Sequence, residues 1–108
     1  MTEERRTSPR HEASIAGEIE LATGKSSIAI TRDVSAVGLL VFSRREHAIG
    51  DAIKIRLLRG ETLREIAARV VRQERLTPHE STLWRTKVGV VVDDPDAFAK
   101  IIAELDAA

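Results

Sequence analysis

Cysteine is missing from this chain of 108 residues, and aromatic residues are scarce, with one tryptophan, two phenylalanines and no tyrosine. Without cysteine the chain has no disulfide bonds and no thiol chemistry, which fits the reducing cytoplasm that we expect as its location. The few aromatic residues disfavour a protein that binds single-stranded nucleic acid by base stacking. No apolar run approaches the ~20 residues of a membrane helix, and the polar start of the chain does not resemble a secretory signal, so we expect no membrane association.

The chain also lacks net charge, because 17 basic residues balance 17 acidic ones. A protein that coats nucleic acid has a basic surface, so we expect neither DNA nor RNA as a partner. The charge is unevenly spread, since residues 93–108 contain five acidic residues and one lysine, a sum of −4, which leaves +4 on the first 92 residues. Thirteen of the basic residues are arginine, whose planar guanidinium suits bidentate contacts with phosphate and guanine.

Hydrophobic residues alternate with polar ones along most of the chain, which is the pattern of half-buried strands. The turn residues between these segments separate about six short strands. The predicted strands are residues 12–21, 28–33, 38–43, 53–57, 63–75 and 83–92. Residues 63–75 also fit a helix with four apolar residues on one face, but the pair Val70–Val71 and the neighbouring β pattern favour a strand.

The end of the chain has a helical pattern instead. Asp94 suits an N-cap, Pro95 suits the first helical position, and an apolar stripe follows at helical spacing. The stripe consists of Phe98, Ile101, Ile102 and Leu105. We therefore predict an all-β fold, a small six-stranded antiparallel β-barrel whose C-terminal amphipathic helix, at about residues 95–107, packs against it.

Two short motifs stand out in the first third of the chain. Arg6 and Arg10 form R-x-x-x-R with Arg5 beside them, and Asp33, Ser35 and Gly38 form D-x-S-x-x-G after the first predicted hairpin. In this order and near this separation, the motifs resemble the PilZ domain, whose best-known members bind the bacterial second messenger cyclic di-GMP. The resemblance implies the same barrel with a flanking C-terminal helix, in a bacterial protein.

The resemblance also implies a ligand site. Its expected cyclic di-GMP-binding residues are Arg5, Arg6, Arg10, Asp33, Ser35 and Gly38. A guanidinium grips the O6 and N7 atoms of guanine or pairs with phosphate, and a carboxylate accepts hydrogen bonds from the N1–H and N2–H₂ of guanine. A serine hydroxyl reaches base or phosphate, and a glycine provides unusual backbone freedom and close approach of a ligand.

Each motif has a plainer interpretation when taken alone. The arginines fit a solvated basic segment, and the second motif fits an ordinary turn. Gly89 resembles a glycine of the family's last strand; it either faces the ligand or relieves crowding in the barrel, and we favour the second reading. For Trp84 we expect packing in the core or between barrel and helix, not a stacking role.

The function that follows is a single-domain, non-enzymatic receptor for cyclic di-GMP. We expect residues 1–11 to form a flexible lead-in that clamps the ligand, and residues 12–108 to form the PilZ barrel with its helix. Ordering of the lead-in then changes the surface offered to an unidentified effector protein. We expect a monomer, and the number of nucleotides per chain stays open.

Two other functions are compatible with the sequence. One is a PilZ interaction module or adaptor that binds no nucleotide, for example in pilus or motility regulation, and the other is a small nucleic-acid-binding barrel. No cofactor or metal is expected, because His11, His47 and His79 lie singly, without cysteine or carboxylate at ligand spacing. A serine triad has little support, since no nucleophile elbow is present.

Overall fold

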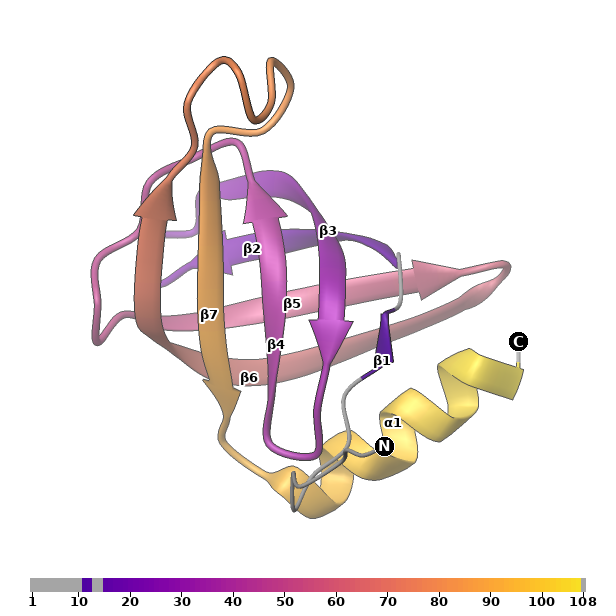
Figure 1. Ribbon diagram of the computed structural model, residues 1–108. Helices are drawn as coiled ribbons and strands as arrows, with labels where there is room; N and C mark the ends of the chain where they lie inside the picture. Colours follow the sequence, from indigo (N-terminus) through magenta and orange to yellow (C-terminus); the bar gives the residue numbers. More distant parts are fainter. Residues whose placement is uncertain (1–10, 13–14, 108) are drawn as a thin grey trace, which may run out of the picture.

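The computed structural model describes residues 11–12 and 15–107, which form seven strands followed by one helix (Figure 1). The elements are β1 (His11–Glu12), β2 (Ala16–Leu21), β3 (Ser26–Val34), β4 (Gly38–Ser43), β5 (Ala52–Arg59), β6 (Thr62–Arg75), β7 (Thr86–Val92) and α1 (Pro95–Ala107). Strands β2 to β7 pair antiparallel in the order β3-β2-β5-β6-β7-β4, and β4 pairs back onto β3 to close the ring. The prediction of a six-stranded antiparallel barrel with a C-terminal helix is confirmed.

The predicted strand over residues 12–21 is divided in the structure. Its first part, β1, pairs with the end of β3, with His11 opposite Val34, whereas β2 pairs with the start of β3 and with β5. Between the two parts, the backbone N–H of Ile15 donates to Thr31 Oγ1 at 2.9 Å, and the Thr31 N–H donates to the Ile15 carbonyl at 3.0 Å. At Ile15 a threonine side chain thus accepts the backbone N–H that a carbonyl would accept in a regular ladder.

The barrel interior contains the alternate apolar residues of the strands, as the period of two predicts. The buried hydrophobic residues are Ile15, Ile19, Ala29, Val34, Leu39, Val41, Ile53, Ile55, Leu57, Ile66, Ala68, Val70, Val88, Val90 and Val92, with Phe98 and Leu105 of α1. Residues 63–75 lie within β6, where Ile66, Ala68 and Val70 point inward, so the strand interpretation is confirmed.

Helix α1 lies across the end of the barrel at which β7 ends and the β3–β4 hairpin lies (Figure 1). Asp94 caps it as predicted, since Asp94 Oδ1 accepts the Ala97 N–H at 3.1 Å. Phe98 and Leu105 are fully buried, while Ile101 and Ile102 pack partly buried against the core. No helix among the described residues is long and apolar enough to span a membrane.

The last strand begins later than predicted, at Thr86 and not at Leu83. Ser81 Oγ accepts the backbone N–H groups of Leu83 at 3.1 Å and Trp84 at 2.9 Å, which folds this stretch into a turn. Trp84 is therefore half-buried in the connection between β6 and β7, at the barrel end opposite α1 (Figure 1). Its predicted packing in the core or against the helix is wrong.

Buried polar residues close the barrel at the end away from α1. Ser43 and Thr86 are fully buried there, and the Ser43 hydroxyl lies 2.9 Å from Nε2 of the buried His47. The Thr86 hydroxyl donates to the Arg45 carbonyl at 2.7 Å, and the His47 backbone N–H donates to the Gln73 side chain. These hydrogen bonds satisfy most of the polar groups named here, whereas the buried Nδ1 atom of His47 has no hydrogen-bond partner among the described residues.

Candidate ligand-binding site

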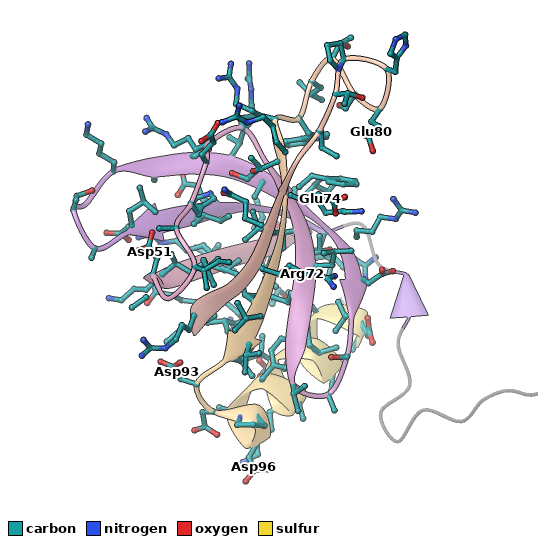
Figure 2. All side chains as sticks on the ribbon, turned by 60° about the vertical axis from the view of Figure 1, so that its left-hand side comes forward. Asp51, Arg72, Glu74, Glu80, Asp93 and Asp96 are labelled. Atoms are coloured by element: carbon teal, nitrogen blue, oxygen red, sulfur yellow. The ribbon has the colours of Figure 1, made fainter. Side chains whose placement is uncertain are left out.

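A cavity of about 380 Å³ lies on the outer face of the barrel, where the β3–β4 hairpin meets β6 and β7. Its lining residues are Asp33, Ser35, Val37, Gly38, Leu39, Leu40, Val71, Arg72, Gly89, Val90 and Val91. The three described residues of the D-x-S-x-x-G motif are therefore brought together in one cavity. Figure 2 shows Arg72 between the loop that carries Glu80 at one end of the molecule and the start of α1, with Asp96, at the other.

The hairpin that carries Asp33 and Ser35 is held by short-range hydrogen bonds. The Ser35 N–H donates to the Gly38 carbonyl at 3.0 Å, and Ser35 Oγ accepts the Val37 N–H at 3.4 Å. The Val92 N–H donates to the Val37 carbonyl at 2.9 Å, which ties the hairpin to β7. Asp33 lies at the end of β3 and Ser35 directly follows the strand; both line the same cavity and both are half-buried.

Gly38 lines the cavity, but the barrel requires it for a different reason from the one that the sequence suggests. Its backbone does not adopt the left-handed conformation, which occurs at Gly24, Gly50 and Gly60. A Cβ atom added to Gly38 would instead overlap the carbonyl oxygen of Val90 on the paired strand β7. The glycine allows two strands to approach closely, so the expectation of special backbone freedom at this position is wrong.

Gly89 lies on the outer face of β7 and forms part of the cavity floor. It alternates with Val88 and Val90, which are buried in the barrel, so it does not relieve crowding there, and that interpretation is wrong. A Cβ atom added to Gly89 would lie 3.4 Å from Arg72 Cβ and 3.7 Å from Arg72 Nε, both ordinary contact distances. The space above Gly89 is therefore open apart from the Arg72 side chain.

Arg72 is the one charged residue in the described lining of this cavity that the sequence motifs do not predict. It carries no motif, and in a regular β6 the alternation of Ile66, Ala68 and Val70 would direct position 72 into the barrel. The pairing between β6 and β7 shifts register between Val70 and Arg72, and this irregularity turns Arg72 to the outside. A bulge of this kind leaves no clear trace in the sequence.

The predicted ligand-binding arginines, Arg5, Arg6 and Arg10, lie outside the described residues. The first described residue, His11, pairs with Val34, and Glu12 pairs with Asp33. The chain thus enters the described structure beside the end of β3, next to the residue that begins the D-x-S-x-x-G motif. Within the described part of the chain, no three residues of the metal-binding types are grouped as a metal site would require.

A second cavity, of about 550 Å³, is lined by residues of β3, β4 and β7 and of the connection between β6 and β7. Trp84 lines it together with Phe42 and Lys87, and the Arg32 guanidinium lies 5.7 Å from the centre of the Phe42 ring. This geometry is a cation–π contact within the protein itself. Trp84 therefore contributes to an outer surface.

Comparison with known proteins agrees with the architecture. A family model for the PilZ domain matches residues 4–105. The curated proteins include no match to this chain. The PilZ domain of YcgR from Escherichia coli, solved with c-di-GMP, superposes with a TM-score of 0.69 and 15% identity, covering 96% of this chain and 93% of that one.

Two further solved structures are similar. The PilZ domain of CeSA from a cellulose-synthesizing bacterium has a TM-score of 0.64 and 17% identity, covering 92% of this chain and 96% of that one. The MrkH–c-di-GMP complex of K. pneumonia has a TM-score of 0.66 and 14% identity, covering 96% of this chain but 53% of that one. At these identities the structures show a common fold.

The fold thus defines a small closed barrel with one capping helix and a hairpin-built cavity on its outer face. Because the family model spans almost the whole sequence, this chain belongs to the PilZ domain family.

Proposed function

We propose that this chain is a receptor for cyclic di-GMP that binds the nucleotide between its N-terminal segment and the β3–β4 hairpin. The single observation that carries the proposal is the cavity that Asp33, Ser35 and Gly38 line together. It lies next to the end of β3, with which β1 pairs. The solved YcgR and MrkH structures, which contain c-di-GMP, support the choice of ligand.

The chemistry of the cavity fits a guanine base. The Asp33 carboxylate is an acceptor for the N1–H and N2–H₂ of guanine, and charge strengthens such hydrogen bonds. The Ser35 hydroxyl, held by its hydrogen bonds within the hairpin, adds a group that donates or accepts. Val37 and Val91 add exposed apolar surface for a flat ring.

The arginines of the R-x-x-x-R motif supply the positive charge that a cyclic dinucleotide with two phosphates needs. Arg6 and Arg10, with Arg5, precede β1 directly in the sequence, and β1 is paired with Asp33 and Val34. We infer that these guanidinium groups contact phosphate and guanine from the side opposite the hairpin. Binding then fixes the N-terminal segment against the barrel, and this change is what an effector protein reads.

Calorimetric titration of the chain with cyclic di-GMP tests the proposal, with GTP as the control ligand. The wild-type chain is expected to bind the cyclic dinucleotide saturably, and Asp33→Asn and Arg10→Ala are each expected to weaken binding by at least tenfold, as lost charge-assisted hydrogen bonds do. Lys25→Ala serves as a matched control, because Lys25 lies in the β2–β3 turn, outside the cavity.

The outcomes separate the candidate functions. Saturable binding that the two variants lose supports a receptor. A wild-type chain that does not bind at millimolar ligand overturns the proposal and favours the interaction module, whereas strongly salt-dependent binding of oligonucleotides favours the nucleic-acid-binding barrel. Binding that both variants retain places the nucleotide elsewhere on the molecule.

A further inference from the structure

The register shift in β6 changes which side chains face the cavity. Val70 pairs with Val90 and Arg72 pairs with Gly89, so Val71 is the extra residue of a bulge. Val71 and Arg72 are both exposed as a result, and Gln73 turns toward His47. Without the bulge, the Arg72 cation would lie in the apolar interior, at a large cost in desolvation. The bulge thus adds an arginine to the cavity wall.

Arg72 differs from the other arginines of strands β5 and β6 in its partners. Arg56, Arg59, Arg64 and Arg75 form salt bridges with carboxylates, and Arg69 donates to the Gly50 carbonyl. Among the described residues, Arg72 has neither a salt bridge nor a side-chain hydrogen bond. Its side chain runs across Gly89 and leaves its guanidinium available to a ligand.

The surroundings of Arg72 favour a flat ring over an isolated phosphate. Val71 and Val91 are 48% and 42% exposed and border the same cavity. Asp33 and Ser35 stand on its other side, on the β3–β4 hairpin. A purine whose edge meets Asp33 and Ser35 would thus present its face to Arg72 and the two valines, and guanidinium planes stack well on such faces.

We propose that Arg72 is a binding residue that stacks its guanidinium on a guanine of the ligand. Gly89 has no side chain and so leaves room for the Arg72 side chain to lie across β7. The inference rests on the proposed function, since it assigns a role within the same cyclic di-GMP site. It adds a contact from the last part of β6 to those of the hairpin and the N-terminal segment. Stacking, unlike simple charge attraction, depends on the planar shape of the group at position 72.

Three substitutions separate these two roles in a titration with cyclic di-GMP. Arg72→Ala removes both the positive charge and the planar group and is expected to weaken binding by roughly tenfold. Arg72→Lys keeps the charge without the plane and is expected to weaken binding nearly as much, whereas Arg72→Trp keeps a plane and is expected to bind within about threefold of wild type. Arg44→Ala is the matched control, because Arg44 is exposed at the opposite end of β4 from Gly38 and outside the cavity.

A fluorescence measurement gives a second readout of stacking. In a Trp84→Phe background, the indole introduced by Arg72→Trp is the one tryptophan of the chain, and cyclic di-GMP is expected to quench its emission with the affinity found by calorimetry. Unchanged emission at saturating ligand would overturn the stacking geometry.

The titration outcomes distinguish failure of the Arg72 inference from failure of the proposed receptor function. Wild-type binding with Arg72→Ala unchanged overturns the inference and leaves the proposed receptor function intact. Retained binding by Arg72→Lys with loss in Arg72→Trp also overturns it, because charge alone then suffices. Absence of wild-type binding overturns the receptor function, and the role of Arg72 falls with it. Denaturation of each variant by urea, compared with wild type, identifies any loss that comes from unfolding.

Discussion

Gly38 and Val90 lie so close across the β4–β7 ladder that a side chain at position 38 would overlap the Val90 carbonyl oxygen. Gly89, one residue earlier on β7, has open space above it apart from the Arg72 side chain. The two glycines border the same cavity but are needed for different reasons. The first is a requirement of strand packing, and the second keeps the cavity floor free.

Alanine substitution is expected to separate the two glycines. Gly38→Ala forces β4 and β7 apart and is expected to lower the free energy of unfolding by roughly 1–3 kcal/mol. Gly89→Ala is expected to leave stability unchanged or to raise it by up to about 1 kcal/mol, because glycine is a poor strand residue. Urea denaturation followed by circular dichroism measures both, and equal destabilisation by the two variants would contradict the distinction.

The N-cap of α1 is expected to contribute to the stability of the domain. Asp94→Ala removes the acceptor of the Ala97 N–H and is expected to cost about 1 kcal/mol, which lowers Tm by roughly 4–8 °C. Asp96→Ala is the matched control, since Asp96 is exposed in the first turn, where the helix dipole favours its charge, and its loss is expected to cost about 0.3 kcal/mol. A larger effect at Asp96 than at Asp94 would contradict the capping assignment.

The stability of the barrel is expected to fall in mild acid because of His47. Burial lowers the pKa of His47 below its ordinary 6.5, and nearby Arg45 lowers it further, against an opposing effect of Asp51. The unfolded chain therefore binds more protons than the folded chain between the folded pKa and 6.5, so the free energy of unfolding decreases as pH falls through this window. Above 6.5 this contribution is fully present.

Urea denaturation at a series of pH values between 7 and 5 measures this effect. The His47→Gln variant is expected to show a shallower decrease than wild type, whereas His79→Gln, which alters an exposed histidine of the β6–β7 connection, is expected to match wild type. Parallel curves for wild type and His47→Gln would show that other groups cause the acid sensitivity.

Ligand binding is expected to protect β1 as well as the hairpin. If cyclic di-GMP is held between the N-terminal segment and the β3–β4 hairpin, hydrogen exchange at the amides of His11 and Glu12 slows in the complex. The same ligand is expected to raise Tm, since a hundredfold excess over Kd adds about 2.7 kcal/mol to stability. Protection of the hairpin with unchanged exchange in β1 would argue against a role for the N-terminal segment.

Much of the fold could be predicted from the sequence, because its determinants are local. The alternation of residues in β5 and β6 and the Asp94–Pro95 start of the helix each depend on neighbours in the chain. The β-branched pair Val70–Val71 correctly predicts a strand over residues 63–75. The alternation predicts a start of β7 three residues before the observed one, because the Ser81 side chain accepts backbone N–H groups that the strand pattern assigns to a ladder.

The candidate site could be predicted in part. The grouping of Asp33, Ser35 and Gly38 follows from their spacing in one hairpin, whereas the place of Arg72 depends on the register between two strands that are joined by a long connection. The structural reasons for Gly38 and Gly89 differ from the sequence predictions, since they depend on contacts with Val90 and Arg72 that no local pattern encodes. The contacts of Arg5, Arg6 and Arg10 stay predictions.

The closed order of the strands limits the ways in which a partner can dock. Each of the strands from β2 to β7 already has a neighbour on both sides, and the end of β3 is covered in addition by β1. Where strands are paired on both sides, a protein cannot add a strand to the sheet, which is the route by which many open-edged domains capture extended peptides; β1 and residues 62–66 of β6 are paired on one side only. Side chains on the barrel wall, the helix and the loops therefore offer most of the surface for recognition, and point substitutions on these surfaces are a direct way to map it.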